Sequence, residues 1–456
     1  MPVSDDEQIV ADVVVLGSGM SGITVAATAA ERGAAVVVID TADHIGGSAA
    51  LSGGYVWTAP TLEVFREQDP QGDVEHFSQL LHEFPDALSW VEGLGVTMGP
   101  TVSDILGYGT GRQIDIGHYM KRCKRLIESA GGSVFFETEP VRLLTLENCV
   151  VGVEARELRT GDVAQIRASA VVLCTGGFQG NPNLRDKYIY PGASSLLLRS
   201  NPESSGSGLR LALEVGASMT PLTGGFYGHL FPYPMDKVDP NEYTLMSQYY
   251  SNHALILDRS GRRIVDESWG DHLNNQAVAP LGSSLIFADE RVRREQVVIP
   301  YLPGLEAVDK MRLASERGSN YATGTTVEEV ASSAEQWGYD AEGIVETVRS
   351  YNRAMKEGLP VTPTRKLHRR ELNEPPFAIL EVQATITFGY DGLATDIDGR
   401  VLSGDLPIVG LYAAGVDAGG LNAWGYTGGL VRGLALGRRV GSVVLRAASV
   451  KDTSTK

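Results

Sequence analysis

The sequence predicts an α/β fold in which helices cover a parallel sheet and a second, α+β domain is inserted into the first. Residues 8–40 read as strand, helix and strand, with a glycine-rich turn after the first strand. Residues 170–174, AVVLC, form a continuous apolar run of the kind found in buried parallel strands. From about residue 224 tyrosines, prolines and histidines gather, and strand patterning returns at Phe377. These changes predict a first part of the main domain at 1–224, an inserted domain at 225–375 and a C-terminal part of the main domain at 376–456.

The other elements follow from residue periodicity. Apolar residues recur at helical spacing over residues 74–94 and 119–130, which predicts two helices. Residues 133–136 and 142–154 have the pattern of strands in a hairpin-like layer. The last strong pattern predicts a helix from about residue 429 to residue 447.

Length, charge and cysteine content exclude several classes of protein. The 456 residues are enough for two or three domains with their own cores. The net charge of −17 argues against nucleic acid or a membrane as a partner. The three cysteines are widely spaced and form no CxxC pair, so we expect a reducing compartment, no disulfide framework and no metal. No apolar run reaches the ~20 residues that span a bilayer, and the acidic N-terminus lacks the regions of a signal peptide, so a cytoplasmic protein is expected.

The turn at residues 17–22, GSGMSG, has the spacing of a dinucleotide-binding fingerprint. Gly17 allows a tight turn, Gly19 lets the backbone approach a pyrophosphate, and Gly22 lets the helix pack closely on the strand. The amides that begin this helix, together with its dipole, favour phosphate charge. Asp40 ends the next strand, where a carboxylate accepts hydrogen bonds from ribose hydroxyls. These residues predict a Rossmann-like site and leave open which dinucleotide binds.

Three further segments narrow the choice of dinucleotide. Residues 46–54, GGSAALSGG, are small and suit close approach by a ligand. Residues 172–178, VLCTGGF, are similar to the ATGG strand end of flavoproteins with two dinucleotide domains, and residues 410–417, GLYAAGVD, are similar to their GLYAAGE segment. In that family an acidic residue there binds a ribityl hydroxyl, and Asp417 stands where glutamate is usual. Together the four loops predict FAD, with the helix that begins after Gly428 directing its amides at the flavin N1/O2 edge.

The whole chain resembles the FAD-dependent fumarate reductase and 3-ketosteroid dehydrogenase superfamily, most specifically in residues 10–54, 170–178 and 385–442. The resemblance implies that the inserted domain is a cap or substrate domain. Gly47 and Ser48 stand about where succinate dehydrogenases place the histidine that bonds covalently to FAD, so we expect non-covalent FAD. The expected FAD contacts are Gly17, Gly19, Ser21, Gly22, Asp40, Gly47, Ser48, Ser52, Gly53, Gly54, Val141, Thr175, Gly176, Gly177, Gly415, Asp417, Gly429 and Leu430.

The chain departs from the fumarate reductase pattern at three places. Residues 261–267, GRRIVDE, are similar to the family's G.RF.NE segment, but the catalytic arginine expected soon after it is missing from residues 268–272, SWGDH. The family's HTMGG histidine region reads TFGYDG at 387–392, and its NRLGG arginine position reads GYTGG at 425–429. Fumarate and succinate are therefore disfavoured as substrates, and the chain is closer to ketone or tricarballylate dehydrogenases.

Tyr426 indicates a different substrate. Ketosteroid dehydrogenases have a tyrosine in the matching YPG segment, where its hydroxyl and a backbone amide bind the ketone oxygen. Removal of an α-proton requires a stabilised enolate oxygen, and a fixed hydroxyl and amide in a dry pocket provide this stabilisation. We expect Tyr426 and the amide of Gly429 to form such an oxyanion site. The alternative is that Tyr426 only packs over the flavin edge.

The residue that accepts the α-proton stays open between several candidates. Ketosteroid dehydrogenases use a basic tyrosine, and the candidates here are Tyr108, Tyr249 or Tyr250, and Tyr390. Tyr249 and Tyr250 point to opposite faces if the backbone is extended, so at most one of them faces a pocket. Tricarballylate-type dehydrogenases have a histidine near the place of His229, which is the other candidate.

The sequence therefore predicts an FAD-dependent oxidoreductase that acts on CH–CH groups of a small-molecule substrate. The favoured reaction introduces a C=C bond α,β to a ketone, on a cyclic or steroid-like substrate, by α-proton abstraction and hydride transfer to flavin N5. The alternative is the same chemistry on a carboxylic acid, or its reverse as an enoate reductase; a flavoprotein that binds or senses without turnover is a third class. Arg199 and Arg432 could hold a carboxylate, although a phosphate contact or a surface charge is the simpler interpretation of each. The sequence does not specify the electron acceptor, the exact substrate, the direction of reaction or the oligomeric state.

Overall fold

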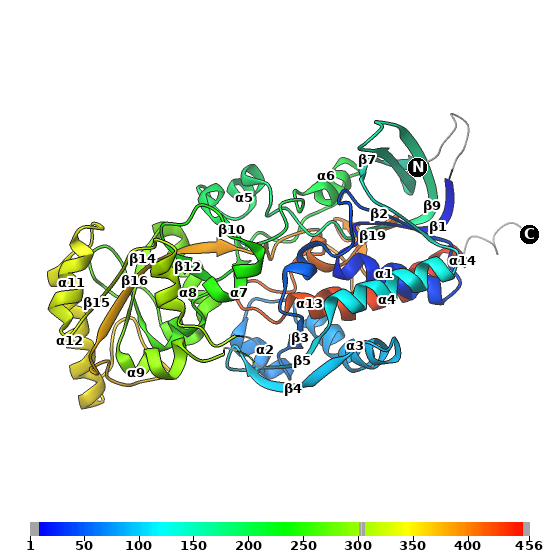
Figure 1. Cartoon of the computed structure of the whole chain (residues 1–456). Helices are drawn as coiled ribbons and strands as arrows, with labels where there is room; N and C mark the ends of the chain where they lie inside the picture. The colour runs from blue at the N-terminus through cyan, green and yellow to red at the C-terminus, as the bar shows by residue number, and fades with distance from the viewer. Residues whose placement is uncertain (1–8, 301, 303–305, 450–456) are drawn as a thin grey trace, which may run out of the picture. The chain divides into compact units, whose positions relative to one another are not determined.

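The computed structural model describes residues 9–300, 302 and 306–449, so the acidic residues 1–7 lie outside the described chain (Figure 1). The chain divides into two compact units. The first unit consists of Met1–Tyr190, Ser200–Phe226 and Phe388–Lys456, and the second of Pro191–Arg199 and Tyr227–Thr387.

The first unit is built on a sheet with the strand order β18–β19–β9–β1–β2–β6. All neighbours from β19 to β6 pair in parallel, whereas β18 pairs antiparallel with β19. A hairpin of β7 and β8 continues the sheet from β9. The strands are β1 (Ile9–Leu16), β2 (Val36–Ile39), β6 (Ser133–Phe135), β7 (Thr138–Leu146), β8 (Cys149–Glu157), β9 (Val163–Leu173), β18 (Arg400–Ser403) and β19 (Leu406–Ala413). This sheet confirms the predicted α/β fold.

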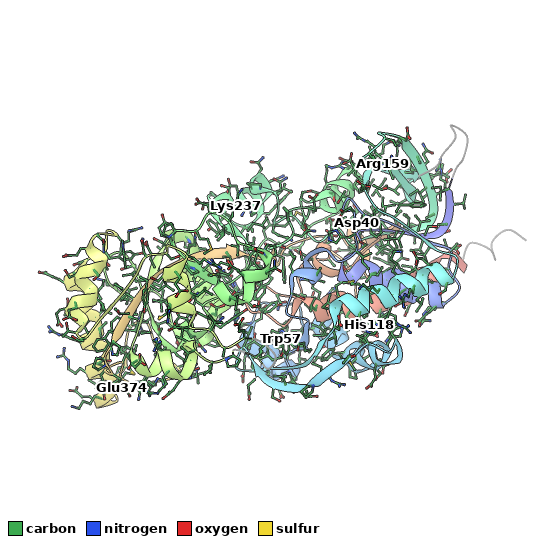
Figure 2. All side chains as sticks on the ribbon, viewed as in Figure 1. Asp40, Trp57, His118, Arg159, Lys237 and Glu374 are labelled. Carbon is green, nitrogen blue, oxygen red and sulfur yellow. The ribbon has the colours of Figure 1, made fainter. Side chains whose placement is uncertain are left out.

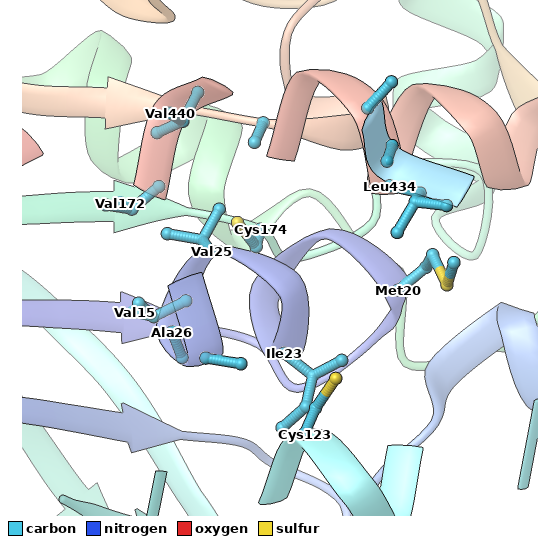
Figure 3. Close-up of a cluster of buried hydrophobic side chains, with 14 of the residues drawn as sticks. Val15, Met20, Ile23, Val25, Ala26, Cys123, Val172, Cys174, Leu434 and Val440 are labelled. Atoms are coloured by element: carbon cyan, nitrogen blue, oxygen red, sulfur yellow. The ribbon is translucent and has the colours of Figure 1, made fainter. Parts of the chain in front are cut away.

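Alternate residues of β1 contribute to the two hydrophobic cores of the first unit. Val13 and Val15 belong to a core that includes the helices α1 (Met20–Glu31), α4 (Ile116–Ser129) and α14 (Gly437–Ser449). Val14 and Leu16 belong to a separate core on the other face. Figure 3 shows α1 at the centre of the first core, with Ile23 beside Cys123 and Val25 beside Cys174. Each fully buried valine or leucine stabilises the fold by about 1.5–3 kcal/mol, so the cores fix α1 on the sheet.

Smaller elements complete the first unit. The helices predicted at 74–94 and 119–130 are α3 and α4; α4 begins earlier, at Ile116, because the Asp115 side chain caps it by accepting from the His118 amide at 2.9 Å. The helix predicted from 429 contains a π-helical stretch, η9. The remaining elements are η1 (Gly47–Leu51), β3 (Tyr55–Thr58), α2 (Leu62–Gln68), α3 (Val74–Gly93), β4 (Met98–Ile105), β5 (Gly109–Ile114), α5 (Pro182–Tyr188), α6 (Ser207–Glu214), η8 (Gly415–Asp417), α13 (Gly429–Val431) and η9 (Arg432–Leu436).

The second unit is built around the long strand β16, which pairs with β10, β12, β14 and β15. Because β16 spans Phe377–Ile386, this unit extends past residue 375, the end expected from the sequence. It also includes Pro191–Arg199, because β10 pairs in parallel with β16. Its elements are β10 (Leu197–Leu198), β12 (Leu230–Pro232), α7 (Tyr243–Met246), η4 (Tyr249–His253), β13 (Leu255–Leu257), α8 (Asp271–Val278), β14 (Ser284–Ala288), α9 (Glu290–Val292), α10 (Lys310–Glu316), β15 (Tyr321–Gly324), α11 (Val327–Glu335), α12 (Ala341–Glu357) and β16. The chain enters this unit through β11 (Phe226–Tyr227) and leaves it before β17 (Phe388–Gly389).

A buried group of charges holds together distant segments of the second unit. The Glu267 carboxylate is fully buried and accepts from Arg263 at 2.6 and 2.9 Å and from Arg365 at 3.1 Å. The two guanidinium groups also donate to carbonyl oxygens of Pro363 and Ala254, at 2.6 and 2.8 Å. The segment 261–267, which is similar to a fumarate reductase motif, therefore has a structural role in this unit.

No helix in the described ranges is both long enough and apolar enough to cross a membrane.

We predict that Glu267→Gln destabilises the second unit by about 3–5 kcal/mol, because it leaves two buried guanidinium groups without their counter-charge. The matched control is Glu316→Gln, which removes an exposed pair with Arg312 and should change stability by less than about 0.5 kcal/mol. Urea unfolding followed by circular dichroism measures both variants. Equal midpoints for the two variants would contradict the role assigned to the buried group.

Candidate functional site

The glycine turn lies where the carboxyl ends of two parallel strands meet. Leu16, the last residue of β1, pairs with Leu173, the last residue of β9, and the Cys174 amide donates to the Leu16 carbonyl at 2.8 Å. The sheet order reverses here, since the chain passes from β1 to β2 on one side while β9 lies on the other. In α/β sheets such a switch point is where ligands bind.

Two glycines of the turn have no room for a side chain. Gly17 has φ +100°, and a Cβ atom there would lie 2.2 Å from the Cys174 carbonyl oxygen. A Cβ atom on Gly22 would lie 1.8 Å from the Gly17 carbonyl oxygen. Both contacts are far below van der Waals distance, so these glycines allow the turn and the close packing of α1 on β1.

Gly19 differs from the other two glycines because it faces open space. A Cβ atom there would meet only the Gly46 carbonyl oxygen, at 3.8 Å. Gly19 is also the N-cap of α1, and no side chain caps the first-turn amides of this helix. An open approach to uncapped helix amides fits the pyrophosphate of a dinucleotide.

The Asp40 carboxylate is held against the glycine turn. One oxygen accepts from the amide and the hydroxyl of Ser18, at 2.5 and 2.6 Å, and the other accepts from the Ala42 amide at 2.9 Å. Figure 2 marks this side chain after the end of β2. The turn therefore orients the carboxylate, and its contact with a ribose stays a prediction.

The second small-residue segment lies beside the turn. Gly46 forms a parallel bridge with Gly19, and η1 follows it. The Ser48 hydroxyl lies 3.0 Å from that of Ser200, and the Ser52 hydroxyl donates to the Ala49 carbonyl at 2.7 Å. The structure therefore brings Gly46 and Gly47 next to Gly19, and the contacts of Gly47, Ser48 and Ser52 with a cofactor stay predictions.

The Asp417 carboxylate is hydrogen-bonded to the turn that follows β9 and fixes its conformation. It accepts hydrogen bonds from the Thr175 amide, from the Thr175 hydroxyl at 3.0 Å, and from the amides of Gly176 and Gly177 at 3.2 and 3.3 Å. Burial raises the pKa of Asp417, whereas these donors lower it. The sequence suggested a ribityl contact for this residue; the structure shows it bound to the protein's own backbone.

Two further predicted FAD contacts, Val141 and Gly415, lie at irregular backbone, and a third, Leu430, lies in a helix. Val141 sits at a register shift in β7, and its carbonyl accepts from Arg210 at 3.3 and 3.4 Å. Gly415 begins η8 with φ +69°, and a Cβ atom there would lie 2.4 Å from the Ser21 hydroxyl oxygen. Leu430 follows Gly429 in α13, whose N-cap carries no side-chain hydrogen bond.

The structure brings Tyr426 and Gly429 together. The Tyr426 hydroxyl accepts from the Gly429 amide at 2.8 Å. Aromatic side chains surround this pair: the Trp57 ring lies 5.3 Å from the Tyr426 ring in an edge-on arrangement, and the Phe388 ring lies 6.1 Å away. The Tyr108 hydroxyl donates to the Tyr426 carbonyl oxygen. A hydroxyl and an amide therefore lie side by side within an aromatic wall (Trp57 is marked in Figure 2).

A buried carboxylate fixes the loop that carries Tyr426. Asp69, which follows α2, accepts from the amides of Ala423 and Trp424 at 2.8 and 3.1 Å and from the Asn422 side chain at 3.2 Å. Burial raises the pKa of Asp69. The sequence analysis did not identify this residue, because nothing local links it to a loop more than 350 positions away.

Two of the tyrosines considered as bases are too deeply buried to ionise readily. Burial raises the pKa of Tyr108 and of Tyr390 well above the ordinary value for tyrosine. Tyr390 is fully buried, and its hydroxyl has no hydrogen-bond partner among the described residues. In the second unit, Tyr250 belongs to the hydrophobic core, and burial raises its pKa well above the ordinary value. Burial therefore makes each of these phenols harder to ionise than an exposed tyrosine, and a role as the base stays a prediction for each.

His229 is held on both sides within the second unit. Its Nδ1 atom is hydrogen-bonded to Asp271, the first residue of α8, and its Nε2 atom lies 2.7 Å from the Tyr227 hydroxyl. The Tyr249 ring packs edge-on against the imidazole at 4.9 Å. The His229 amide and carbonyl are bonded to the Thr385 hydroxyl, at 3.0 and 2.8 Å. The sequence analysis did not predict the contact between Tyr227 and His229, although residues two positions apart lie on one face of an extended segment.

The two arginines considered for a carboxylate are not surface charges. Arg199 is 9% exposed; it donates to the Thr387 hydroxyl at 3.2 Å, lies over the Tyr243 ring, and its Nε atom has no partner among the described residues. Arg432 donates to the Ala418 carbonyl, and burial lowers its pKa to about 10. The simpler interpretation of each as a surface charge is therefore wrong.

The chain was compared with known proteins. Residues 105–430 match the family model described as "FAD binding domain", and residues 12–177 match one described as "FAD dependent oxidoreductase". The chain is 25% identical over 455 residues to the fumarate reductase (cytochrome) of Shewanella frigidimarina, covering 92% of this chain and 74% of that protein. It is 24% identical over 533 residues to the 3-oxosteroid 1-dehydrogenase of Mycolicibacterium smegmatis, covering 89% of this chain and 91% of that protein.

The fold is shared with a solved ketosteroid dehydrogenase. The Δ4-(5α)-dehydrogenase structure from Rhodococcus jostii RHA1 superposes with a TM-score of 0.74 at 21% identity, covering 97% of this chain and 98% of that one. Because the first family model matches more than half of the chain, the protein belongs to the FAD binding domain family. It is an FAD-dependent oxidoreductase related to the fumarate reductases and the 3-oxosteroid dehydrogenases.

We predict that Gly19→Ala lowers the affinity for FAD about tenfold or more, which corresponds to about 1.4 kcal/mol or more. Its φ of −69° suits alanine and a Cβ atom meets no close neighbour, so the variant should fold normally while its methyl group points into the space expected for the pyrophosphate. Gly93→Ala is the matched control, because a Cβ atom there also has nothing within 4 Å. Titration of the apoprotein with FAD measures affinity, and thermal unfolding checks the fold; unchanged FAD affinity in Gly19→Ala would place the pyrophosphate elsewhere.

Proposed function

We propose that the protein is an FAD-dependent dehydrogenase that introduces a C=C bond α,β to a ketone of a cyclic or steroid-like substrate. The observation that carries the proposal is the 2.8 Å pairing of the Tyr426 hydroxyl with the Gly429 amide inside an aromatic wall. The relationship to a 3-oxosteroid 1-dehydrogenase supports a ketone as the group recognised.

Tyr426 and Gly429 would bind the ketone oxygen and stabilise the negative charge that develops on it when an α-proton leaves. Two contacts hold this pair in place before a substrate arrives: the Asp69 carboxylate fixes the amides of Ala423 and Trp424, and the Tyr108 hydroxyl fixes the Tyr426 carbonyl. The Gly429 amide, which donates to the Tyr426 oxygen, would exchange that hydrogen bond for one to the ketone oxygen, while the fixed backbone limits the other rearrangement that the reaction requires.

The surroundings of the pair favour an apolar ketone over a charged acid. Trp57, Phe388 and Tyr426 form ring-on-ring contacts, and burial raises the pKa of the neighbouring Tyr108 and Tyr390. Both observations describe a dry environment, where hydrogen bonds to a developing charge are stronger than in water. FAD, held by the turns at Gly19 and Gly177 and by the helix that begins at Gly429, would supply the hydride acceptor.

A carboxylic acid is the second candidate substrate, and Arg199 is the observation that favours it. This guanidinium lies in the second unit with an unpartnered Nε atom among the described residues, and it is close enough to His229 to lower the pKa of that imidazole. A buried cation with unused hydrogen-bonding capacity can bind a carboxylate. The relationship to a fumarate reductase is consistent with this alternative.

Anaerobic mixing of the FAD-loaded protein with substrate panels separates the two candidates. Saturated ketones, from cyclohexanone to a saturated 3-ketosteroid, should bleach the flavin absorbance. Bleaching by saturated di- or tricarboxylates alone would replace the ketone proposal with the acid alternative.

We predict that Tyr426→Phe lowers kcat by roughly 10²–10³, because removing one oxyanion donor has an effect of this size, while FAD binding is retained. Tyr412→Phe is the matched control; it removes another buried tyrosine hydroxyl of the first unit, from strand β19. Stopped-flow flavin reduction measures the rate, and the flavin spectrum measures FAD content. An unchanged reduction rate in Tyr426→Phe would remove this residue from the oxyanion site.

A further inference from the structure

We propose that the second unit binds a phosphate group through Arg370 and the imidazoles of His253 and His368. All three residues belong to the second unit. The inference goes beyond the proposed ketone reaction, because none of the three is among the residues expected to bind FAD or a ketone. The ligand is a phosphorylated small molecule or free phosphate.

The two imidazoles come from distant segments of the chain and lie against each other. His253 is the last residue of η4, whereas His368 lies in the loop between α12 and β16. Their ring centroids are 4.0 Å apart, and the ring planes are tilted by 38°. Because His253 is half-buried and His368 is exposed, a ligand can reach the pair from solvent.

One buried arginine holds the backbone at both imidazoles. Arg365 is 1% exposed, and it donates to the carbonyls of Asn252 and Ala254, which flank His253, at 2.8 Å each. Its Nε atom donates to the His368 carbonyl at 3.3 Å. His368 has φ +51°, a value that is uncommon outside glycine and persists where the surroundings hold the residue. The imidazole pair is therefore positioned before a ligand binds.

Arg370 presents unused hydrogen-bond donors at this pair. Its Nη1 atom donates to the Glu295 carboxylate at 3.1 Å, whereas its Nε and Nη2 atoms are buried and have no partner among the described residues. These two atoms form the edge of a guanidinium group that binds two oxygens of one anion. A buried donor without a partner is costly, and an anion that reaches this edge removes the cost.

The charges that act on the imidazoles are positive. Burial lowers the pKa of His253 to about 3, and His368, Arg370 and Arg365 act in the same direction. Burial also lowers the pKa of His368, followed by the charges of Arg365 and Arg370. A bound anion would offset the repulsion from the arginines, whereas a metal cation would add to it.

The neighbouring carboxylates leave an excess of positive charge. Glu295 pairs with Arg370 and, at 3.4 Å, with Arg294. Glu374, which is marked in Figure 2, pairs with Arg291 and Arg294 at 3.6 Å each. Three guanidinium groups thus share two carboxylates. An anionic ligand would balance this cluster.

The directions of the donors favour phosphate over a carboxylate. A carboxylate has two oxygens, and the edge of Arg370 formed by Nε and Nη2 binds both. A phosphate group has further oxygens, which can accept hydrogen bonds from His253 and His368. The two imidazoles therefore have a role with phosphate that they lack with a carboxylate.

Titration of the FAD-loaded protein with inorganic phosphate at constant ionic strength tests the site. In protein labelled with ¹³C at the histidine Cε1 atoms, phosphate should shift the NMR signals of His253 and His368 in a saturable manner. Glycerol phosphate identifies the source: tighter binding than inorganic phosphate indicates a phosphorylated small molecule, and weaker binding indicates free phosphate. The proposal is overturned by equal binding of acetate, or by the absence of a saturable shift up to about 10 mM phosphate, which detects a Kd of about 1 mM.

Variants of Arg370 separate the two-donor edge from simple charge. Arg370→Gln should weaken phosphate binding about tenfold or more, and Arg370→Lys should also weaken it, because lysine keeps the charge but lacks the edge. The matched control is Arg349→Gln, which removes an exposed arginine paired with Glu328 and should change the affinity by less than about twofold. His368→Gln, at an exposed position, should weaken binding by roughly threefold or more and tests the site even if the Arg370 variants do not fold. Equal affinities in His368→Gln and Arg349→Gln would overturn the proposal.

Sulfate provides a pH test, because it keeps its charge while the imidazoles titrate. Anion binding raises the pKa of His253 and His368, so the sulfate affinity should rise as the pH falls from about 8 to about 5. This rise should disappear in the double variant His253→Gln/His368→Gln. The other charged groups of the site and its loop do not titrate near neutral pH; they are Arg365, Lys366, Arg369, Arg370 and Glu295. A sulfate affinity that is independent of pH in the unsubstituted protein would overturn the proposal.

Discussion

The close approach of the backbone at Gly17 to the carbonyl of Cys174 is the contact on which the first unit depends. It joins the carboxyl ends of β1 and β9, and a Cβ atom at Gly17 would lie 2.2 Å from that carbonyl oxygen. Because both strands end there, α1 begins at the same edge of the sheet as the turn at Thr175. The helix amides and the second glycine turn can then face one ligand, which is what a dinucleotide of FAD's length requires.

Three carboxylates fix the loops around this edge, of which Asp69 and Asp417 are buried and Asp40 is half-buried. Asp40 binds Ser18 in the first turn, Asp417 binds the turn at Thr175, and Asp69 binds the loop that carries Tyr426. Each accepts two or more hydrogen bonds, most of them from backbone amides, which stabilise the charge of the carboxylate and fix its position. A loop held in this way loses its conformational entropy during folding. Less conformational entropy is then lost when a ligand binds.

The sequence predicted those parts of the site whose partners are close along the chain. The glycine turn could be read from residues 17–22, and the pairing of Tyr426 with Gly429 spans only three positions. Asp69 and Ala423 are 354 positions apart, and His229 and Asp271 are 42 apart, so no local pattern links them. For Asp417 the ligand contact suggested by its segment stays a prediction, whereas its four hydrogen bonds to the turn at Thr175 could not be predicted, because the two segments are 242 positions apart. The domain boundary shows the same limit, since β16 belongs to the second unit through its pairing and not through its composition.

Burial disfavours the charged form of both phenols and imidazoles, which limits the groups that can move protons in this protein. It makes Tyr108, Tyr250 and Tyr390 harder to ionise. The same effect lowers the pKa of His229, so its neutral imidazole is a weaker proton acceptor than that of an exposed histidine. Burial therefore favours the neutral form of both kinds of side chain near pH 7.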